Sequence, residues 1–248
     1  MTLLSEETDV FEAAPGQRCA VLFLARRRAA PAPGGALPAD RAVRPVMERL
    51  DALKGEGWRL SVDRVLAGDG AEADEHPDSP TVYATGFSHD VDFVGLFEAP
   101  SPSAALRGVA ALEAAGWARA LRTQWLVGPR EFLPVVGAAS RPEDDWAFFA
   151  LWKWNAAWHA ASAEQRRAYD LECDVAFAAD VRAGAAIAGR HRLDGASEWD
   201  HVGVWRVPGV AMVQAAMREH TRVADFKFTT SRHYLGRRTR LDDALRRK

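Results

Sequence analysis

Cysteine is rare in this sequence, with only Cys19 and Cys173 among 248 residues. The two lie in different halves of the chain and neither belongs to a CxxC pair, which excludes a disulfide framework and a zinc-finger pattern. No apolar run approaches the roughly 18 residues of a membrane helix. The first residues are acidic and lack the basic and apolar regions of a secretory signal peptide. We therefore expect a cytoplasmic protein with no membrane partner.

An excess of charge of one sign is also missing. The formal net charge is −2 and the sequence pI is about 6.4, so no overall basic surplus favours binding to nucleic acid. Basic residues gather between Arg232 and Lys248, but no nucleic-acid-reading motif accompanies them. We interpret this segment as a solvated tail and expect no nucleic-acid partner. The sequence contains no GxSxG, P-loop, GxGxxG or HExxH motif, so nothing in it indicates the activities that these motifs accompany.

An internal repeat is the clearest pattern that is present. The segment 92–100 (DFVGLFEAP) aligns with 200–208 (DHVGVWRVP), and aspartate, valine, glycine and proline coincide at the same offsets. In the same register, 121–130 (LRTQWLVGPR) falls on 229–238 (TTSRHYLGRR), with Gly128 on Gly236. Two matching stretches at one constant offset favour duplication over chance.

Each half has the pattern of a β-α-β-β-α-β unit. In the first half we expect strands at 19–24, 58–66, 92–98 and 118–127. Its first helix is expected to end at Gly55 or Gly57, and its second to run from Ser101-Pro102 to Gly116. In the second half we expect strands at 146–154, 186–193, 200–207 and 225–234. A capping box at Ser162 and Gln165 predicts a helix that runs to about Arg182.

A single unit of this kind leaves one face of its sheet bare, and two units can bury these faces against each other. We therefore predict an α+β fold in which two tandem ferredoxin-like β-α-β-β-α-β repeats pack as one α/β barrel. The first repeat is expected to span residues 1–130 and to be structural. The second is expected to span 142–248 and to bear the site, with 131–141 as the connection.

Alternation along the strands predicts which side chains share a face. In strand 200–207, Val202 and Val204 suit the helix-covered side, which leaves His201, Gly203 and Trp205 for the bare side. The aligned bare-side residues of the first repeat are Phe93, Gly95 and Phe97. In the last strand, Phe226 and Phe228 suit the covered side, and Lys227, Thr229, Ser231 and His233 the bare side. We therefore expect the side chains that carry the chemistry to lie in the second repeat.

Three histidines, His191, His201 and His233, line one cavity if His191 also points inward. Such a group could bind a transition metal or haem iron, with Glu172 as a further ligand, or act as acid and base. Hydrogen-bonded histidines at the barrel rim are the alternative. We expect a cofactor in this cavity to contact Trp205, Trp152, Lys227, Arg190 and Arg192.

The other polar and aromatic clusters each have two interpretations. Arg190 and Arg192 could pair with a carboxylate such as a haem propionate, or form surface ion pairs. Asp170 and Asp174 lie one helical turn apart and could meet a metal or a base, or form a solvated acidic face. Trp152, with Trp154 and Trp158, is either core packing or an aromatic wall around a flat ligand.

The second half resembles the chlorite dismutase-like branch of the dimeric α/β barrel superfamily. The resemblance is carried by 163–167 (AEQRR), which opens the long helix, by Leu193-Asp194-Gly195, and by strand 200–206. It implies a haem in the C-terminal half, with chemistry on chlorite, peroxide or coproporphyrin. It also implies a proximal histidine on the long helix and a distal arginine on the next strand. Glu172 and Ala185 stand at those positions, so changed or lost haem chemistry is expected.

We therefore predict an oxidoreductase or lyase of specialised metabolism, with a haem or metal site in the second-repeat cavity. A small-molecule substrate and a homo-oligomer are expected. Two alternatives remain open. One is a cofactor-free α/β-barrel monooxygenase, isomerase or cyclase acting on an aromatic small molecule. The other is a non-enzymatic ligand-binding relative.

Overall fold

The computed structural model describes residues 18–28, 39–67, 80–86, 88–131, 145–195, 197–223 and 225–246. The first repeat contains β1 (Cys19–Arg27), α1 (Ala39–Gly55), α2 (Val62–Ala67), β2 (Thr81–Ala84), β3 (Phe93–Ala99), α3 (Pro102–Ala115), α4 (Trp117–Ala120) and β4 (Leu121–Pro129). The second contains β5 (Trp146–Trp154), α5 (Ala156–Ala160), α6 (Ala163–Arg182), β6 (Ala186–Arg192), β7 (His201–Val207), α7 (Val210–Arg222), the 3₁₀ turn η2 (Asp225–Lys227), β8 (Thr229–Arg240) and α8 (Leu241–Leu245). Most of the predicted connection 131–141 lies outside the described residues.

The strands form one sheet in the order β4-β1-β3-β2-β8-β5-β7-β6. Each repeat contributes four antiparallel strands in the same internal order, with its first strand between its fourth and third. Strands β2 and β8 join the repeats on one side, where Tyr83 pairs with Arg238. On the other side Arg130 forms a bridge with His191, which closes the sheet. The predicted pair of ferredoxin-like repeats packed as one barrel is confirmed.

The two glycines aligned in the repeat lie at the two seams between the repeats. A Cβ on Gly128 would lie 1.6 Å from the carbonyl oxygen of Arg192, where β4 meets β6. A Cβ on Gly236 would lie 2.6 Å from the Cβ of Tyr83, where β8 meets β2. Glycine is therefore required at both positions because another backbone approaches too closely for a side chain.

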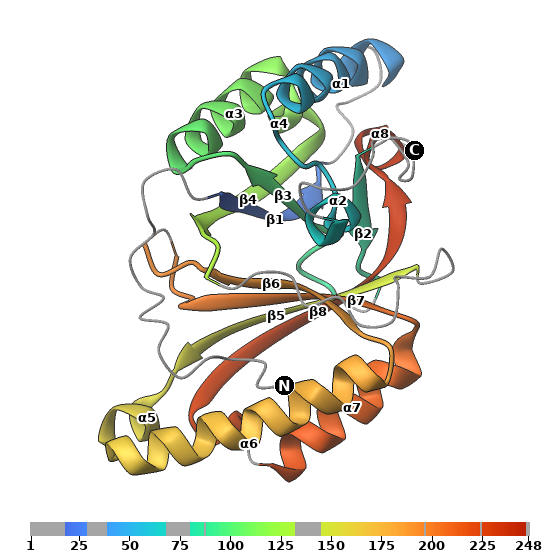
Figure 1. Cartoon of the computed structure of the whole chain (residues 1–248). Coiled ribbons are helices and arrows are strands. Elements are labelled where there is room, and N and C mark those ends of the chain that lie inside the picture. Colours follow the sequence, from blue (N-terminus) through green and yellow to red (C-terminus); the bar gives the residue numbers. More distant parts are fainter. Residues whose placement is uncertain are drawn as a thin grey trace.

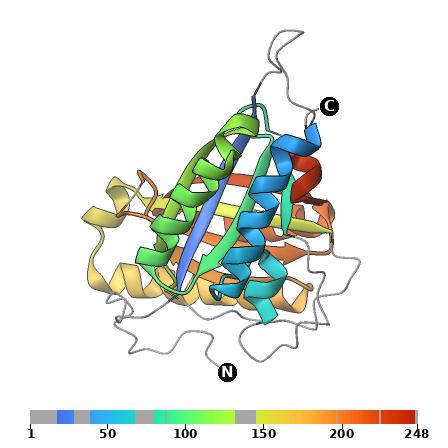
Figure 2. The same ribbon diagram turned by 90° about the horizontal axis from the view of Figure 1, so that it is seen from above.

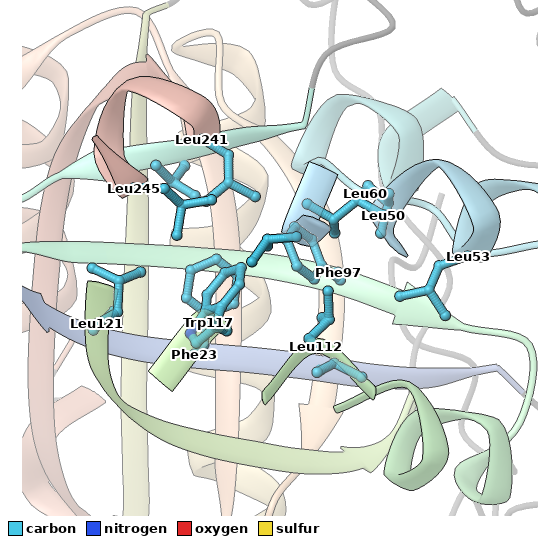
Figure 3. Packing of buried hydrophobic residues seen from close by; sticks show 14 of the residues in the cluster. Phe23, Leu50, Leu53, Leu60, Phe97, Leu112, Trp117, Leu121, Leu241 and Leu245 are labelled. Carbon is cyan, nitrogen blue, oxygen red and sulfur yellow. The ribbon is translucent and has the colours of Figure 1, made fainter. Parts of the chain in front are cut away.

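The structure has four layers, with helices on the two outer sides and the strands of the two repeats between them (Figure 1). Helices α1 and α3 cover the outer face of the first repeat's strands, and α6 and α7 cover that of the second (Figure 1). Figure 2 shows α1 and α3 lying side by side across the first set of strands. The core beneath these helices is aromatic, with Phe23 5.3 Å from Trp117 and 4.9 Å from Phe97 between ring centroids (Figure 3). Leu241 and Leu245 of the C-terminal α8 also pack into it.

The predicted assignment of the strand faces is wrong in both repeats. Val202 and Val204 lie in the barrel interior, in one core with Val94 and Leu96 of the first repeat. Trp205 instead packs under the helices, with Val213 and Ala216 of α7. Phe93 and Phe97 are likewise in the core under α1 and α3. Alternation separates two faces but does not say which one is inside, and here the aliphatic face fills the space between the sheets.

The predicted strand 58–66 is also wrong. Only Arg59 forms a bridge, with Glu98, and the next residues form α2. The Ser61 hydroxyl accepts a hydrogen bond from the Arg64 N–H, which favours a helical turn. Val62, Val65 and Leu66 have helical spacing and pack inside the barrel. The segment satisfies both periodicities, and burial of the helical face against the barrel decides between them.

The strand at the C-terminal end is longer than predicted. Residues 225–227 form a 3₁₀ turn, and β8 then runs from Thr229 to Arg240. The part of the basic segment between Arg232 and Arg240 is therefore a strand inside the sheet and not a solvated tail. Strand β4 also begins later than predicted, at Leu121, because α4 precedes it.

Candidate functional site

The helix-facing side of the second repeat's strands carries three rows of four side chains. Counted across β8, β5, β7 and β6, the first row is Leu235, Phe148, Trp205 and Ile187. The middle row is His233, Ala150, Gly203 and Arg190. The third row is Ser231, Trp152, His201 and Arg192.

The centre of the middle row is built from small residues. Ala150 and Gly203, which we call the open floor, are both partly exposed although helices cover this face. Within 4 Å, a Cβ on Gly203 would meet only Trp205 Nε1, at 3.4 Å, among the described residues. The aligned glycine of the first repeat, Gly95, differs, because a Cβ there would lie 2.2 Å from the ring of Phe23. One repeat fills this position and the other leaves it open.

Aromatic side chains border the open floor on both sides. Phe148 and Trp205 have their ring centroids 5.4 Å apart in the first row. In the third row the rings of Trp152 and His201 are stacked, with centroids 4.1 Å apart. Small residues between aromatic side chains suit a flat ligand, which would cover the floor and contact the rings.

A buried carboxylate connects two of the polar residues beside the floor. Glu131 Oε2 accepts a hydrogen bond from Arg190 Nε at 2.6 Å, and Glu131 Oε1 lies 3.1 Å from His201 Nε2. The Glu131 side chain is 2% exposed. Burial acts to raise its pKa, but the hydrogen bond with His201 and the charge of Arg190 outweigh burial and hold the pKa below its usual value. Glu131 is therefore an ionised carboxylate at neutral pH.

The state of Glu131 fixes the tautomer of His201. An ionised carboxylate only accepts hydrogen bonds, so the hydrogen of a neutral His201 lies on Nε2 and Nδ1 is the basic nitrogen. Nδ1 is buried and has no hydrogen-bond partner in the part of the chain that the structure describes. An imidazole held by a carboxylate with its second nitrogen unused is the arrangement of a general base.

Helix α6 carries two carboxyl groups, Asp170 and Asp174, and the first interacts with Arg190 of the site. Burial raises the pKa of Asp170, the charge of Arg190 opposes this shift, and the nearby Asp174 adds to it. Burial also raises the pKa of Asp174, whose Oδ1 has no hydrogen-bond partner among the described residues. The predicted pair is thus partly desolvated and not a fully solvated acidic face.

The three predicted histidines do not share one face. His201 and His233 are on the helix-facing side, two strands apart and two residues apart along the strands, which places them about 12 Å from each other. His191 points into the barrel interior, where burial lowers its pKa to about 3 and neither ring nitrogen has a partner among the described residues. In the described parts of the chain, no group of three or more His, Cys, Asp or Glu side chains could hold a metal ion.

The other predicted contact residues are divided between the site and the surface. Trp152, Trp205 and Arg190 border the open floor. Arg192 forms an ion pair with Asp194 at 2.7 Å. Lys227 and Glu172 are exposed, Lys227 in η2 and Glu172 on α6. His233 also lines an open pocket of about 540 Å³ between β8 and residues 88–90.

Sequence reasoning missed Glu131 and the buried pair of His220 and Asp180. Glu131 stands at the end of β4 in what the sequence indicated was a connection. His220 Nε2 lies 2.7 Å from Asp180 Oδ2, and the pair joins α7 to α6 beneath Phe177. Strand pairing in the structure gives Ala150 the position that Phe23 has in the first repeat, because Phe23 pairs with Gly95 and Ala150 pairs with Gly203.

A closed barrel of two ferredoxin-like repeats in one chain defines a dimeric α/β barrel protein. No protein-family model and no curated protein matches the sequence. Solved structures of chlorite dismutase from Candidatus Nitrospira defluvii are similar. An arginine-to-lysine mutant has a TM-score of 0.69 at 15% identity, covering 98% of this chain and 96% of that one. The complex with imidazole has a TM-score of 0.67 at 16% identity, with the same coverage.

The fold of this protein is therefore chlorite dismutase-like, as the sequence resemblance predicted. Identities of this size establish the fold and leave the reaction to be argued from the site. None of the helices within the described ranges is long and apolar enough to cross a membrane.

Proposed function

We propose that this protein is an enzyme that binds a flat, carboxylate-bearing small molecule on the open floor and transfers a proton to or from it through His201. The observation that carries the proposal is the buried Glu131, which holds both Arg190 and His201 beside the floor. Isomerases, lyases, cyclases and cofactor-free monooxygenases use such an acid–base group on aromatic substrates.

The guanidinium of Arg190, which is also paired with Glu131, is the group beside the floor that suits an anionic ligand. Arg190 lies at the β6 end of the middle row, with its guanidinium carbon 5.7 Å from the centroid of the Trp152 ring. A guanidinium beside an aromatic border suits a ring system that carries a carboxylate. Burial raises the pKa values of Asp170 and Asp174 on α6, and Asp170 is exposed at the surface of that helix.

Haem is the cofactor that the fold resemblance implies, and its usual ligation does not fit this chain. The flat ring and the propionates of haem would suit the floor and Arg190. The iron ligand would not, because α6 contains no histidine and the residue at the family's ligand position, Glu172, is exposed. Ala185 stands where the family has its distal arginine. We therefore derive no step through haem iron.

Ligand binding can be tested with a panel of flat carboxylates, from naphthoates to iron-free protoporphyrin IX, by quenching of tryptophan fluorescence. Gly203→Leu places a side chain on the open floor and is expected to abolish binding. Gly55→Leu is the matched control, because a Cβ on Gly55 would meet nothing within 4 Å in the described structure and Gly55 ends α1, in the first repeat. Equal binding by both variants would contradict the proposed location.

Proton transfer can be measured without knowing the complete reaction, by the exchange of the ligand's acidic hydrogens with deuterated water. We expect metal-free protein to accelerate this exchange and His201→Asn to slow it by about 100-fold or more. His159→Asn, on the exposed surface of α5, is the control and should exchange at the unaltered rate. Exchange that is insensitive to His201 would remove its catalytic role and leave the binding site standing.

A further inference from the structure

The barrel interior contains two charged clusters at positions that the duplication relates. Glu98 and Arg130 of the first repeat align with Arg206 and Arg238 of the second, at the offset that relates the repeats. A carboxylate in one copy is thus a guanidinium in the other. Because the folds of the two repeats match, the second copy carries a reversed charge at a buried position.

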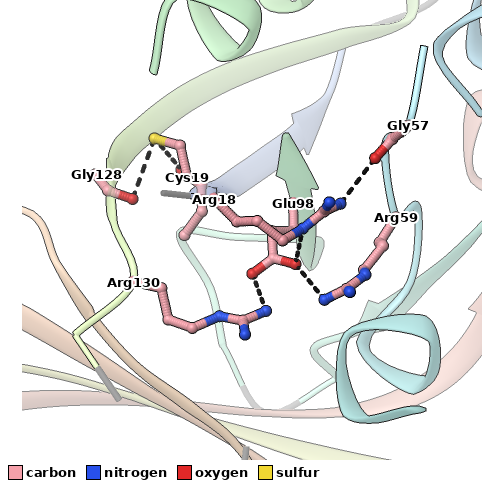
Figure 4. Close-up of polar contacts among 8 residues, drawn as sticks. Arg18, Cys19, Gly57, Arg59, Glu98, Gly128 and Arg130 are labelled. Carbon is pink, nitrogen blue, oxygen red and sulfur yellow. Dashed lines mark hydrogen bonds and ion pairs between the residues drawn. The ribbon is translucent and has the colours of Figure 1, made fainter. Parts of the chain in front are cut away.

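In the first cluster a single carboxylate receives three arginines. Glu98 is fully buried and binds Arg18 at 2.7 Å, Arg59 at 2.8 Å and Arg130 (Figure 4). Arg18 also donates to the carbonyl oxygen of Gly57 at 2.8 Å (Figure 4). Each guanidinium therefore contacts an acceptor in this copy, although the three arginines share one carboxylate and Arg130 Nε has no hydrogen-bond partner among the described residues.

In the second cluster two arginines share one carboxylate from α2. Arg206, whose side chain is fully buried, donates a hydrogen bond through Nη1 to Asp63 Oδ1. Arg238 Nη2 forms an ion pair with Asp63 Oδ2 at 3.0 Å, without the geometry of a hydrogen bond. The cluster therefore carries one uncompensated positive charge in a buried environment, which is costly unless it is paired.

The hydrogen-bonding groups left over in this cluster are mainly donors. Arg206 Nε and Nη2 and Arg238 Nε are buried and have no acceptor among the described residues. The hydroxyl of Tyr83 is buried beside Arg206, whose guanidinium can donate to it, so the phenol keeps its own hydrogen to donate elsewhere. Burial raises the pKa of Tyr83 to about 12, so this phenol keeps its proton and is a donor. Buried donors without acceptors usually indicate a bound water or ion.

We propose that the barrel interior binds a small monovalent inorganic anion of halide size between Arg206, Arg238 and Tyr83. The anion would complete the charge that Asp63 leaves uncompensated and accept the unused donors from β7, β8 and β2. This site is on the opposite face of the sheet from the open floor and does not depend on the proposed enzymatic function.

The direct test is a crystal structure of the full chain grown in sodium bromide without chloride, with data collected at the bromine absorption edge. The proposal predicts an anomalous peak in contact with the guanidinium groups of Arg206 and Arg238 and with the Tyr83 hydroxyl. Density for water without an anomalous peak, or an acceptor side chain of the protein in this place, would overturn it.

A solution measurement provides a second test. Bromide should raise the melting temperature of the wild-type protein at constant ionic strength, because it binds the folded state. Tyr83→Phe removes one donor with little change of shape and should weaken bromide binding about tenfold. Arg232→Met removes an exposed arginine paired with Asp90 and should leave the bromide effect unchanged. An equal effect of bromide on the wild-type protein and on Tyr83→Phe would also contradict the proposal.

Discussion

Gly95 and Gly203 occupy the same position in the two repeats, and only Gly95 is covered by an aromatic ring. The ring of Phe23 would lie 2.2 Å from a Cβ on Gly95, whereas a Cβ on Gly203 would meet only Trp205 Nε1 within 4 Å, at 3.4 Å, in the described structure. The strand partners explain the difference, because Gly95 pairs with Phe23 and Gly203 pairs with Ala150.

This difference predicts that the same substitution changes the free energy of unfolding by unequal amounts at the two positions. Gly95→Ala should lower the free energy of unfolding by about 1–3 kcal/mol, because the Phe23 ring must move within a packed core. Gly203→Ala should change it by less than about 1 kcal/mol, because the new methyl group enters open space. Urea denaturation of both variants measures the comparison, and equal destabilisation would show that the second repeat is packed as tightly as the first.

Glu131 should stabilise the fold through its charge. Glu131→Gln leaves Arg190 without its buried carboxylate, and we expect a loss of about 3 kcal/mol. The pKa of Glu131 is lowered in the folded state, so its contribution is present above the usual glutamate pKa and is lost as pH falls through the folded-state value. Urea denaturation between pH 7 and pH 3 should show a shallower decline for Glu131→Gln than for the wild type. Glu164→Gln, at an exposed position of α6, should retain the wild-type pH dependence.

His191 should make the protein sensitive to acid. Its folded-state pKa of about 3 lies below the usual value of 6.5, mainly because of burial, so the unfolded chain binds the proton more readily. Between these values stability should fall by roughly 1.4 kcal/mol for each unit that the pH is lowered, from this residue alone. His191→Leu should flatten this dependence and cost little at pH 7, since no described group hydrogen-bonds the ring. A wild-type slope in that variant would show that His191 is protonated in the folded state.

The seam between the repeats should be intolerant of a single methyl group. Gly128→Ala places a Cβ 1.6 Å from the Arg192 carbonyl oxygen, so β4 and β6 must separate. We expect a loss of at least about 2 kcal/mol in the free energy of unfolding. Gly55→Ala, at the end of α1 where a Cβ meets nothing within 4 Å, should be neutral or slightly stabilising. Thermal denaturation of the two variants tests whether this contact closes the barrel.

The sequence predicted the architecture because the duplication preserves spacing over long stretches. Aligned glycines, strand periodicities and the Ser162 capping box are local signals, and the structure confirms them except for the strand predicted at 58–66. The orientation of the faces could not be predicted, since alternation along β7 is symmetric with respect to inside and outside. Only the packing of both repeats places Val202 in the barrel and Trp205 under the helices.

The sequence predicted only part of the candidate site. His201 and Trp205 were predicted on the bare side of their strand, and Trp152 and Arg190 as cofactor contacts. The structure places all four on the helix-facing side, beside the open floor, and their function there stays a prediction. Glu131 was missed because it reaches His201 across 70 positions of sequence, through closure of β4 against β6. Such a contact leaves no local pattern. His191 differs from His201 only in the parity of its strand position, which a β-bulge after Ile187 helps to set.

The most direct test of the account is a crystal structure of the protein with the flat carboxylate that binds most tightly in the fluorescence panel. The account predicts that the ring lies over Ala150 and Gly203, with its carboxylate within about 3.5 Å of the Arg190 guanidinium. A ligand ring in the barrel interior, or in the first repeat under α1 and α3, would contradict the claim that the second repeat carries the site.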